Sequence, residues 1–366
     1  MLYTIFHMTT DERIKLIKEV GEEIITEEDL SSLLESDEEL IAYDGFEPSG
    51  QIHIAQGILR TLNVNKMTKA GVKFKMLVAD WHAYANNKMG GDLDHIQTVG
   101  KYFIEVWKAC GMNLSHVEFV WASDLVKDPD YWKLVLQISK TNSLKRFIRT
   151  AEIMGRDESM DLTAAQIIYP CMQTADIFKL GAKITQLGMD QRKVNMLARE
   201  IGTQLGFWKP VVVSHHMLMG LAQPPEASGE DKTSRTIAIK MSKSHPDSAV
   251  YMTDTTEDIK RKILKAWAPE GIVEENPILE YCKYILFETF DEIKIIRPEK
   301  FGGTVSYNSY KELERDYANK GLHPLDLKNA VIQLLDQLLE PVRKHFEEND
   351  EAKVLLKKVQ SYQVTR

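Results

Sequence analysis

Cysteine and long apolar runs are scarce in this chain of 366 residues. The 3 cysteines, Cys110, Cys171 and Cys282, are odd in number and lack metal-ligand spacing, which argues against a disulfide framework and a zinc site. No stretch approaches the roughly 20 apolar residues that span a bilayer, and the N-terminus lacks the regions of a signal peptide. We therefore expect a cytoplasmic protein with no membrane contact and no protein-bound metal.

Positive charge is also in deficit, since the formal net charge is -8 at pH 7. Such a balance argues against a protein that coats nucleic acid through bulk electrostatics, so we do not expect DNA as a partner. Local basic clusters remain, and one of them contains Lys140, Lys145, Arg146 and Arg149. The sequence leaves open whether this cluster binds RNA or is a solvated helix face.

The first residues with a clear pattern are helical. Ile14, Ile17, Val20 and Ile24 recur at helical spacing, which predicts a helix through Ile24. Thr26, three residues before Asp29, resembles a helix-capping motif and predicts a second, short helix. Both helices are expected to lie beside the core domain.

Short apolar runs then alternate with helical patterns. The runs predicted to be strands are 40–43, 73–79, 117–121, 182–187 and 211–213. This alternation predicts an α/β fold with a Rossmann-type, doubly wound parallel sheet. In open sheets of this kind, ligands bind beyond the carboxyl ends of the strands, so functional residues should gather there.

We divide the chain into three parts. Residues 1–222 form the sheet domain with its N-terminal helices and a helical insertion at about 128–179, for which Asp128 is the expected N-cap. Residues 223–252 are polar and rich in helix breakers at their start, which predicts a mobile loop and linker. Residues 253–366 return to helical periodicity and form an expected C-terminal all-α domain.

A phosphate site is indicated where the first predicted strand ends. The segment 43–57 reads as a strand end, a loop with Gly45 and Gly50, and a helix start. Backbone N–H groups at a helix N-terminus favour anions, and glycine lets the backbone come close. His53 and Gln56 are candidates to donate to a phosphate. Taken alone, the segment fits an ordinary strand-turn-helix connection equally well.

The pentapeptide Lys240-Met241-Ser242-Lys243-Ser244 is the second candidate phosphate motif. Its two lysines stand in polar surroundings and are suited to move onto a departing pyrophosphate. A short run of Lys and Ser is usually solvated surface. The combination with the histidine segment is what favours a functional interpretation.

Two further segments carry polar side chains at ligand-facing positions. Pro170 suits a helix start. Tyr169, Gln173 and Asp176 would then share one helix face. This face is either a surface that recognises a polar ligand or an ordinary solvated helix face. The segment from Gly188 to Lys193 again reads as strand, glycine and helix start. There, Asp190 either accepts from a ribose hydroxyl or caps the helix.

Together, these motifs resemble the tyrosyl-tRNA synthetases of the archaeal and eukaryotic cytoplasmic type, which are class I aminoacyl-tRNA synthetases. The resemblance covers about 40–344, and the segments that carry it are 45–50, 79–84, 169–173, 188–193, 240–244, 297–303 and 323–329. It implies a ligase of protein biosynthesis that activates L-tyrosine with ATP and transfers it from tyrosyl-adenylate to the 3' end of tRNA(Tyr).

The resemblance also implies roles for single residues in tyrosine binding. Tyr43 and Asp176 would bind the phenolic hydroxyl. The residues that would hold the amino group or form the rest of the pocket are Gly45, Leu77, Ala79, His82, Tyr169, Gln173 and Gln191.

ATP is implied as a substrate that arrives with Mg²⁺. Its implied contacts are Gly50, His53 and Gln56 for the phosphates, Gly188 and Asp190 on the ribose side, Met241 for the adenine, and Lys240 and Lys243 for the pyrophosphate. His53, Gln56, Lys240 and Lys243 would act by positioning and charge stabilisation. Gln56 departs from the general class I pattern, in which a second histidine is common at this position. Its amide can still donate to a phosphate but cannot carry a positive charge.

For tRNA, the resemblance places anticodon contacts at Phe301, His323 and Asp326, and candidate acceptor-end contacts at Arg149 and Lys193. It also implies a homodimer. For His323 with Pro324, the alternative is a helix-entry turn.

Three alternative functions remain open from the sequence. A tryptophanyl-tRNA synthetase shares the fold and both phosphate motifs, although Tyr43 with Asp176 favours a phenol ligand. A small nucleotidylyltransferase leaves the C-terminal helices unexplained. A non-catalytic tRNA-binding or regulatory protein is motivated by Gln56.

Overall fold

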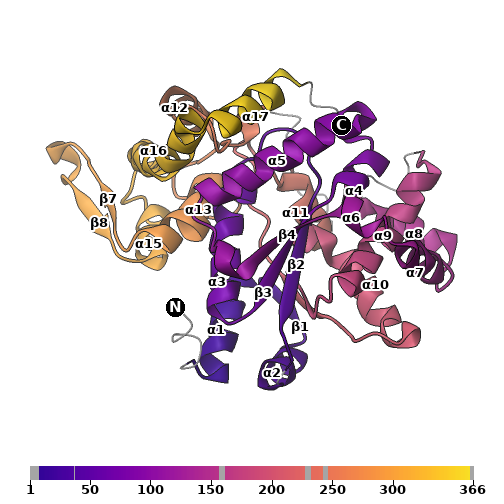
Figure 1. Cartoon of the computed structure of the whole chain (residues 1–366). Coiled ribbons are helices and arrows are strands. Elements are labelled where there is room, and N and C mark those ends of the chain that lie inside the picture. The colour runs from indigo at the N-terminus through magenta and orange to yellow at the C-terminus, as the bar shows by residue number, and fades with distance from the viewer. Residues whose placement is uncertain (1–7, 37, 156–160, 227–231, 242–245, 363–366) are drawn as a thin grey trace.

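A six-stranded sheet lies at the centre of the computed structural model, which describes residues 8–36, 38–155, 161–226, 232–241 and 246–362 (Figure 1). In spatial order its strands are β1 (Glu23–Ile25), β6 (Val211–Ser214), β5 (Ile184–Thr185), β2 (Ile41–Phe46), β3 (Lys73–Val78) and β4 (Val117–Trp121). All neighbours are parallel except β1, which runs antiparallel to β6. The chain winds outward from β2 in both directions, which confirms the predicted doubly wound sheet.

Helices cover both faces of the sheet. Those up to Ile201 are α1 (Thr10–Val20), α2 (Glu27–Glu35), α3 (Arg60–Lys69), α4 (Asp80–Ala85), α5 (Leu93–Ala109), α6 (Ala122–Leu125), α7 (Pro129–Ser139), α8 (Leu144–Thr150), α9 (Ala164–Lys179) and α10 (Arg192–Ile201). Successive strand residues point to opposite faces, so Ala42 and Phe74 pack in one core with α1, α3 and α5. Tyr43 and Leu77 pack in a second core with α7, α9 and α10.

The N-terminal prediction is wrong at Ile24. Helix α1 ends at Val20, and Ile24 pairs with Val213 in the edge strand β1. Spacing alone does not reveal that Gly21 adopts an extended conformation and breaks the helix. The second helix is confirmed, because the Thr26 side chain accepts from Asp29 N at 3.0 Å and caps α2.

The insertion is helical as predicted, and Asp128 caps α7. The prediction that Pro170 begins a helix is wrong, because α9 begins after Thr163, whose side chain forms a capping box with Gln166. Pro170 therefore lies inside α9, where Thr174 Oγ1 donates to its carbonyl at 2.7 Å.

Part of the predicted loop at 223–252 forms helix α11 (Lys232–Ile239). Arg235 in this helix donates to Glu275 Oε1 at 2.6 Å, a contact between segments distant in sequence. This tertiary ion pair is one reason why composition alone fails to predict α11.

The C-terminal part is helical as predicted, and its helices are α12 (Thr256–Lys265), α13 (Pro277–Tyr281), α14 (Phe287–Thr289), α15 (Tyr310–Ala318), α16 (Pro324–Glu348) and α17 (Asp350–Ser361). It also contains an unpredicted hairpin, β7 (Ile293–Ile295) and β8 (Val305–Tyr307), at the far left of Figure 1. Helix α5 lies along α17, and the ring of His95 stacks on that of Tyr362 at 4.0 Å. None of the described helices is long and apolar enough to cross a bilayer.

Candidate active site

The direction of winding reverses between β2 and β5, and the motif residues gather at the carboxyl ends of these strands. Tyr43 and Gly45 lie in β2, and Gly188 follows β5. Gln186 N donates to Tyr43 O at 3.0 Å, so the two strands remain joined up to this edge. Ligands of open α/β sheets bind at such a reversal.

A buried cluster of polar side chains surrounds Tyr43. Burial raises the pKa of Tyr43 well above its usual range, and the charges of Asp176 and Asp44 add to this effect, so its phenol stays neutral. Leu77 and Ala79 belong to the same apolar core as Tyr43. Apolar walls with a few polar groups are typical of a small-molecule site.

Both carboxylate oxygens of Asp176 have partners within the protein. Tyr131 Oη donates to Asp176 Oδ1 at 2.9 Å, and His82 Nε2 lies 2.9 Å from Asp176 Oδ2. Burial lowers the pKa of His82, but the charge and hydrogen bonding of Asp176 outweigh it, and the pKa is raised. His82 thus faces Asp176 directly, in addition to the pocket-lining role implied by the sequence.

Tyr131 is a site residue that the sequence analysis missed. It is fully buried in the first turn of α7, and burial raises the pKa of its phenol well above the usual range. A tyrosine one helical turn before Leu134 and Val135, on the apolar face of a predicted helix, was the available signal. The partner of its hydroxyl was not predictable, because Asp176 lies in another helix.

The predicted amino-group residues form a hydrogen-bonded chain. Gln173 Nε2 donates to Gln191 Oε1 at 3.1 Å, and Gln191 Nε2 donates to Ile153 O at 3.0 Å. The Tyr169 ring meets the His82 ring edge-on at 5.0 Å. Tyr169, Gln173 and Gln191 therefore adjoin the Asp176 cluster.

Tyr169 also contacts Glu47, a second residue that the sequence analysis missed. Burial raises the pKa of Tyr169 well above its usual range, and the charge and hydrogen bonding of Glu47 raise it further. Asn86 Nδ2 donates to Glu47 Oε1 at 3.0 Å. Glu47 thus brings negative charge to the end of the site expected to hold an amino group.

The pentapeptide reaches the segment after β5. Lys240 Nζ lies 2.6 Å from Asp190 Oδ2, so two of the predicted nucleotide residues form an ion pair. Met241 is buried, and its N–H donates to Leu218 O at 3.3 Å. Lys243 lies outside the described residues.

Gly188 permits a close approach at this point. A Cβ there would lie 2.3 Å from Met217 Sδ and 2.7 Å from Asp190 Oδ1. A larger residue would therefore require the side chains of Met217 and Asp190 to shift.

The predicted phosphate loop follows β2. Gly50 has a φ of 111°, a conformation that favours glycine. His53 is buried and pairs with Tyr251 in an isolated bridge. Gln56 stands in the helical turn Ala55–Leu59 that precedes α3, and its carbonyl accepts from Trp107 Nε1 at 2.8 Å.

A buried ion pair lies between the strands of the switch point and the helix that follows the phosphate loop. Arg60, the first residue of α3, pairs with Asp44 and donates to Gln186 O at 3.1 Å. Burial raises the pKa of Asp44 to about 6, against the opposing effect of Arg60. These residues join the switch-point strands to the helix behind the phosphate loop, and the sequence analysis did not identify them.

Comparison with known proteins places the chain in a family. Its residues 35–340 match the family described as tRNA synthetases class I (W and Y). It is 49% identical to the cytoplasmic tyrosine–tRNA ligase 1 of Arabidopsis thaliana, over 97% of this chain and 90% of that protein. It is 43% identical to the tyrosine–tRNA ligase of Thermococcus sibiricus, over 96% of this chain and 99% of that protein.

The chain belongs to the tyrosyl-tRNA synthetases. Among solved structures it resembles the Pyrococcus horikoshii tyrosyl-tRNA synthetase complexed with L-tyrosine, with a TM-score of 0.90 and 41% identity over 96% of this chain and 100% of that one. The resemblance noted from the motifs is therefore confirmed.

The predicted anticodon residues of the synthetase lie on adjoining C-terminal segments. Phe301 is 59% exposed, and Lys300 Nζ lies 4.9 Å from the centre of its ring. His323 caps α16 by accepting from Leu325 N at 3.1 Å, so its helix-entry role is confirmed. Asp326 stands in the first turn of that helix.

One arginine joins these two segments. Arg297 Nε donates to Gly303 O at 3.0 Å, and Arg297 Nη1 donates to Gly321 O at 2.9 Å. Phe301 and His323 each lie two residues from one of these carbonyls, so the segments that carry them are joined through Arg297.

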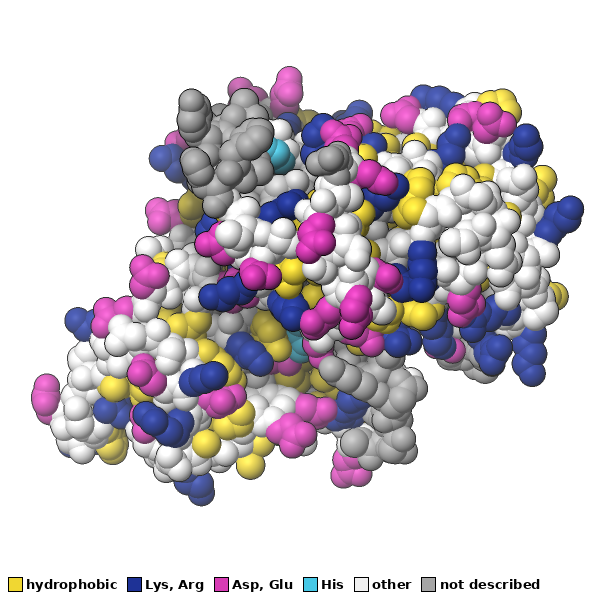
Figure 2. Space-filling view, turned by 90° about the horizontal axis from the view of Figure 1, so that it is seen from below, with side chains coloured by type: hydrophobic (Ala, Val, Ile, Leu, Met, Phe, Trp, Pro, Cys, Tyr) yellow, Lys and Arg dark blue, Asp and Glu magenta, His cyan; other side chains and the backbone are white. Residues whose placement is uncertain are grey.

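The two acceptor-end candidates of the synthetase differ in their contacts. Arg149 is exposed on α8, whereas Lys193 pairs with Glu152. Figure 2 shows Lys and Arg side chains gathered along the right-hand side of one face, where Figure 1 places α7 to α10. In the described part of the chain, no group of three or more His, Cys, Asp or Glu residues is placed to hold a metal ion.

Proposed function

We propose that this synthetase activates L-tyrosine with ATP to form tyrosyl-adenylate and diphosphate, and then transfers tyrosine to the 3' end of tRNA(Tyr). The observation that carries the proposal is the buried pair of Tyr43 in β2 and Asp176 in α9. The tyrosine ligases among its relatives support it, as does the tyrosine bound to the Pyrococcus enzyme.

Selection of tyrosine over phenylalanine rests on Asp176. The phenolic hydroxyl of the substrate would donate to this carboxylate, while Tyr43 completes the polar end of the pocket. Phenylalanine would displace water and leave the carboxylate one hydrogen bond short, which a buried site penalises strongly. Tyrosyl-tRNA synthetases are themselves the standard example of this discrimination.

Adenylate formation requires the tyrosine carboxylate to attack the α-phosphate of ATP. ATP enters with Mg²⁺ as its substrate complex. His53 and Gln56 would donate to the phosphates, while Asp190 and Gly188 adjoin the ribose and Met241 the adenine. Lys240 and Lys243 would stabilise the departing diphosphate. Because Lys240 pairs with Asp190 at 2.6 Å, ATP would have to separate these side chains to bind.

The tRNA would contact the C-terminal surface of Phe301, His323 and Asp326 with its anticodon loop. An exposed aromatic ring beside a histidine suits the stacking of unpaired bases. Arg149 and Lys193 are the candidates nearer the acceptor end. Since Lys193 is paired with Glu152, Arg149 is the more available cation of the two.

We further propose a homodimer formed through the insertion helices. Exposed apolar side chains gather there, namely Trp132, Leu136, Leu144 and Ile168. Leu136 is 64% exposed, and exposed apolar side chains that group together are typical of a contact with another protein surface. Sedimentation of the wild type as a dimer, and of Leu136→Glu as a monomer, is the expected result. A monomeric wild type would contradict it.

The proposed location is the cytoplasm.

Amino-acid-dependent ATP–pyrophosphate exchange tests the proposed function. Exchange with tyrosine alone is the expected result. Exchange with tryptophan alone would identify tryptophan, and not tyrosine, as the substrate. A nucleotidylyltransferase would show exchange with neither amino acid. Absence of exchange with any amino acid, in a protein that binds tRNA, would favour the regulatory alternative.

A further inference from the structure

The chain that follows the pentapeptide lies along the phosphate loop. Ile54 N donates to Val250 O at 2.8 Å, Met252 N donates to Ile52 O at 3.0 Å, and Tyr251 pairs with His53 between them. This short antiparallel pairing fixes the backbone on both sides of His53. Two motifs far apart in sequence are therefore joined directly.

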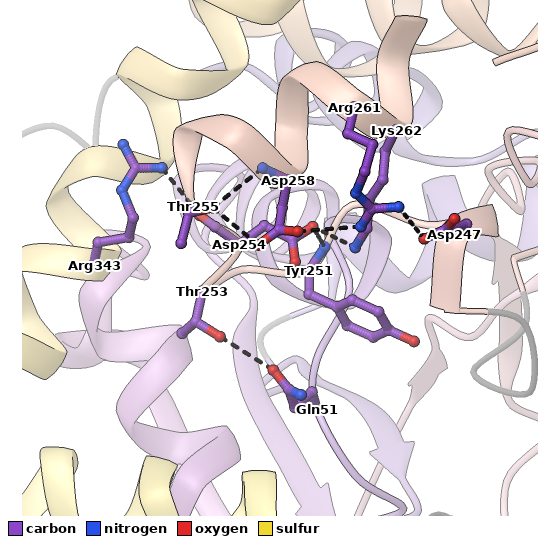
Figure 3. A network of polar contacts seen from close by, with 10 residues as sticks. All are labelled: Gln51, Asp247, Tyr251, Thr253, Asp254, Thr255, Asp258, Arg261, Lys262 and Arg343. Carbon is purple, nitrogen blue, oxygen red and sulfur yellow. Dashed lines mark hydrogen bonds and ion pairs between the residues drawn. The ribbon is translucent and has the colours of Figure 1, made fainter. Parts of the chain in front are cut away.

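A largely buried ion pair holds the far end of this pairing (Figure 3). Asp254 Oδ2 accepts from Tyr251 N at 2.8 Å and from Lys262 Nζ of α12 at 2.6 Å. Lys262 Nζ also lies 4.6 Å from the centre of the Tyr251 ring. One ammonium group thus contacts the carboxylate and the aromatic ring that set the path of residues 251–254.

The same turn is tied to the phosphate loop and to the C-terminal helices. Thr253 Oγ1 donates to Gln51 Oε1 at 3.3 Å. Arg343 Nη1 of α16 donates to Asp254 O at 3.3 Å, and Arg343 Nη2 donates to Asp336 Oδ1 at 2.8 Å. Figure 3 shows these contacts converging on the turn from α12, α16 and the loop at Gln51.

Arg261 and Lys262 are neighbours on α12 and differ sharply in burial. Arg261 pairs with Asp247 and Asp258, and its side chain is 42% exposed. The side chain of Lys262 is 4% exposed. Exposed ion pairs contribute little to stability, whereas removal of one partner of a buried pair leaves an uncompensated charge. Arg261 is therefore a suitable control for substitutions of Lys262 in the same helix.

We infer that Lys262 is a positioning residue for adenylate formation. Through Asp254 and Tyr251, it holds the backbone at His53 where the ATP phosphates are proposed to bind. The contacts of Lys262 are with Asp254 and the Tyr251 ring, neither of which is a predicted substrate contact, and the inference rests on the proposed function. Small displacements of phosphate-binding groups reduce the rate steeply, because the reaction depends on alignment.

The test compares Lys262→Met with Arg261→Met in the full-length protein. The measurements are kcat and the KM for ATP in tyrosine-dependent exchange, the Kd for tyrosine, and the melting temperature. We expect Lys262→Met to lower kcat about tenfold or more. The Kd for tyrosine should stay within about twofold of the wild type, because Asp176 and Tyr131 belong to other elements. Arg261→Met should match the wild type in every measurement.

A double variant separates positioning from the effect of a stranded charge. Asp254→Asn combined with Lys262→Met leaves no unpaired carboxylate and keeps an acceptor for Tyr251 N. Slow exchange in the double variant, with normal tyrosine binding, supports the inference. Recovery to wild-type kcat would overturn it.

Two other outcomes would also overturn the inference. One is a Lys262→Met kcat equal to that of Arg261→Met. The other is weaker tyrosine binding together with a lower melting temperature in both Lys262→Met and the double variant, because this result would indicate general damage to the fold. Failure of the wild type to show any tyrosine-dependent exchange would instead reject the proposed function.

Discussion

Tyr131 of α7 donates a hydrogen bond to Asp176 of α9 across 2.9 Å, and both side chains are fully buried. Asp176 is also held by His82 at 2.9 Å. The carboxylate that is proposed to select tyrosine is therefore oriented from two sides before a substrate arrives. A preorganised acceptor loses less entropy on binding than a mobile one.

Removal of the Tyr131 hydroxyl should weaken tyrosine binding. A hydrogen bond to a charged group contributes about 1.5–3 kcal/mol, and Asp176 keeps its contact with His82, so Tyr131→Phe should raise the KM for tyrosine roughly tenfold. The KM for ATP should not change. Tyr317→Phe is the matched control, since its buried hydroxyl donates to Pro269 O at 2.9 Å in the C-terminal part. Equal effects of both variants on tyrosine binding would contradict the role of Tyr131.

Replacement of Asp176 by a neutral group of the same shape should affect tyrosine far more than ATP. Asp176→Asn should weaken tyrosine binding by roughly a hundredfold, because the hydrogen bond from the phenol loses its charged acceptor. The preference for tyrosine over phenylalanine should fall in parallel. Calorimetric titration with each amino acid measures both. An unchanged affinity for tyrosine would remove Asp176 from the hydroxyl site.

The exposed ring of Phe301 should matter for tRNA and not for amino-acid activation. Base stacking on an aromatic ring contributes about 1–3 kcal/mol, so Phe301→Ala should raise the KM for tRNA roughly tenfold and leave pyrophosphate exchange intact. Val354→Ala, at a 51% exposed position on α17, is the control and should change neither. Equal losses in charging and exchange would point to a folding defect.

His216 should make the free energy of unfolding fall as the pH rises into the alkaline range. Its ring nitrogens lie 3.1 Å from Glu22 Oε2 and 3.1 Å from Glu280 Oε1. Burial lowers the pKa of His216, but hydrogen bonds and charge from Glu22 and Glu280 outweigh it and raise the pKa to about 9. The folded protein therefore keeps a proton that the unfolded chain releases near pH 6.5.

This stabilisation is complete below about pH 6.5 and is lost as the pH rises through about 9. We expect the free energy of unfolding of the wild type, relative to His216→Gln, to fall by about 3 kcal/mol across that window. Urea unfolding of both proteins at several pH values measures the difference. A difference that does not vary with pH would exclude this charge linkage.

Local signals in the sequence were reliable where the responsible atoms are close in the chain. Thr26 and Asp128 cap their helices as predicted, because a capping side chain bonds to an N–H two or three residues away. Pro170 and Ile24 misled the prediction. A capping box at Thr163 begins α9 earlier, and pairing with Val213 draws Ile24 into a strand.

The candidate site shows the same division. The motifs named Tyr43, Asp176, Asp190 and Lys240 as candidates, because the residue types and their order resemble those of the family. The contacts of Asp176 with Tyr131 and His82, and of Lys262 with Asp254, were not predictable, since periodicity says which face a residue occupies and not what it meets there.

The sequence by itself determined the sheet class and the helix starts at Thr26 and Asp128, and it named candidates for the proposed chemistry, because these follow from periodicity, capping and motif order. Only the tertiary structure decided how these residues are held: Asp176 between two side chains, Lys240 against Asp190, and His53 beside the chain that follows the pentapeptide. The physical reason is that each contact joins segments brought together by the winding of the sheet and the packing of its helices. A hydrogen bond or ion pair depends on distances of about 3 Å, which sequence spacing does not fix.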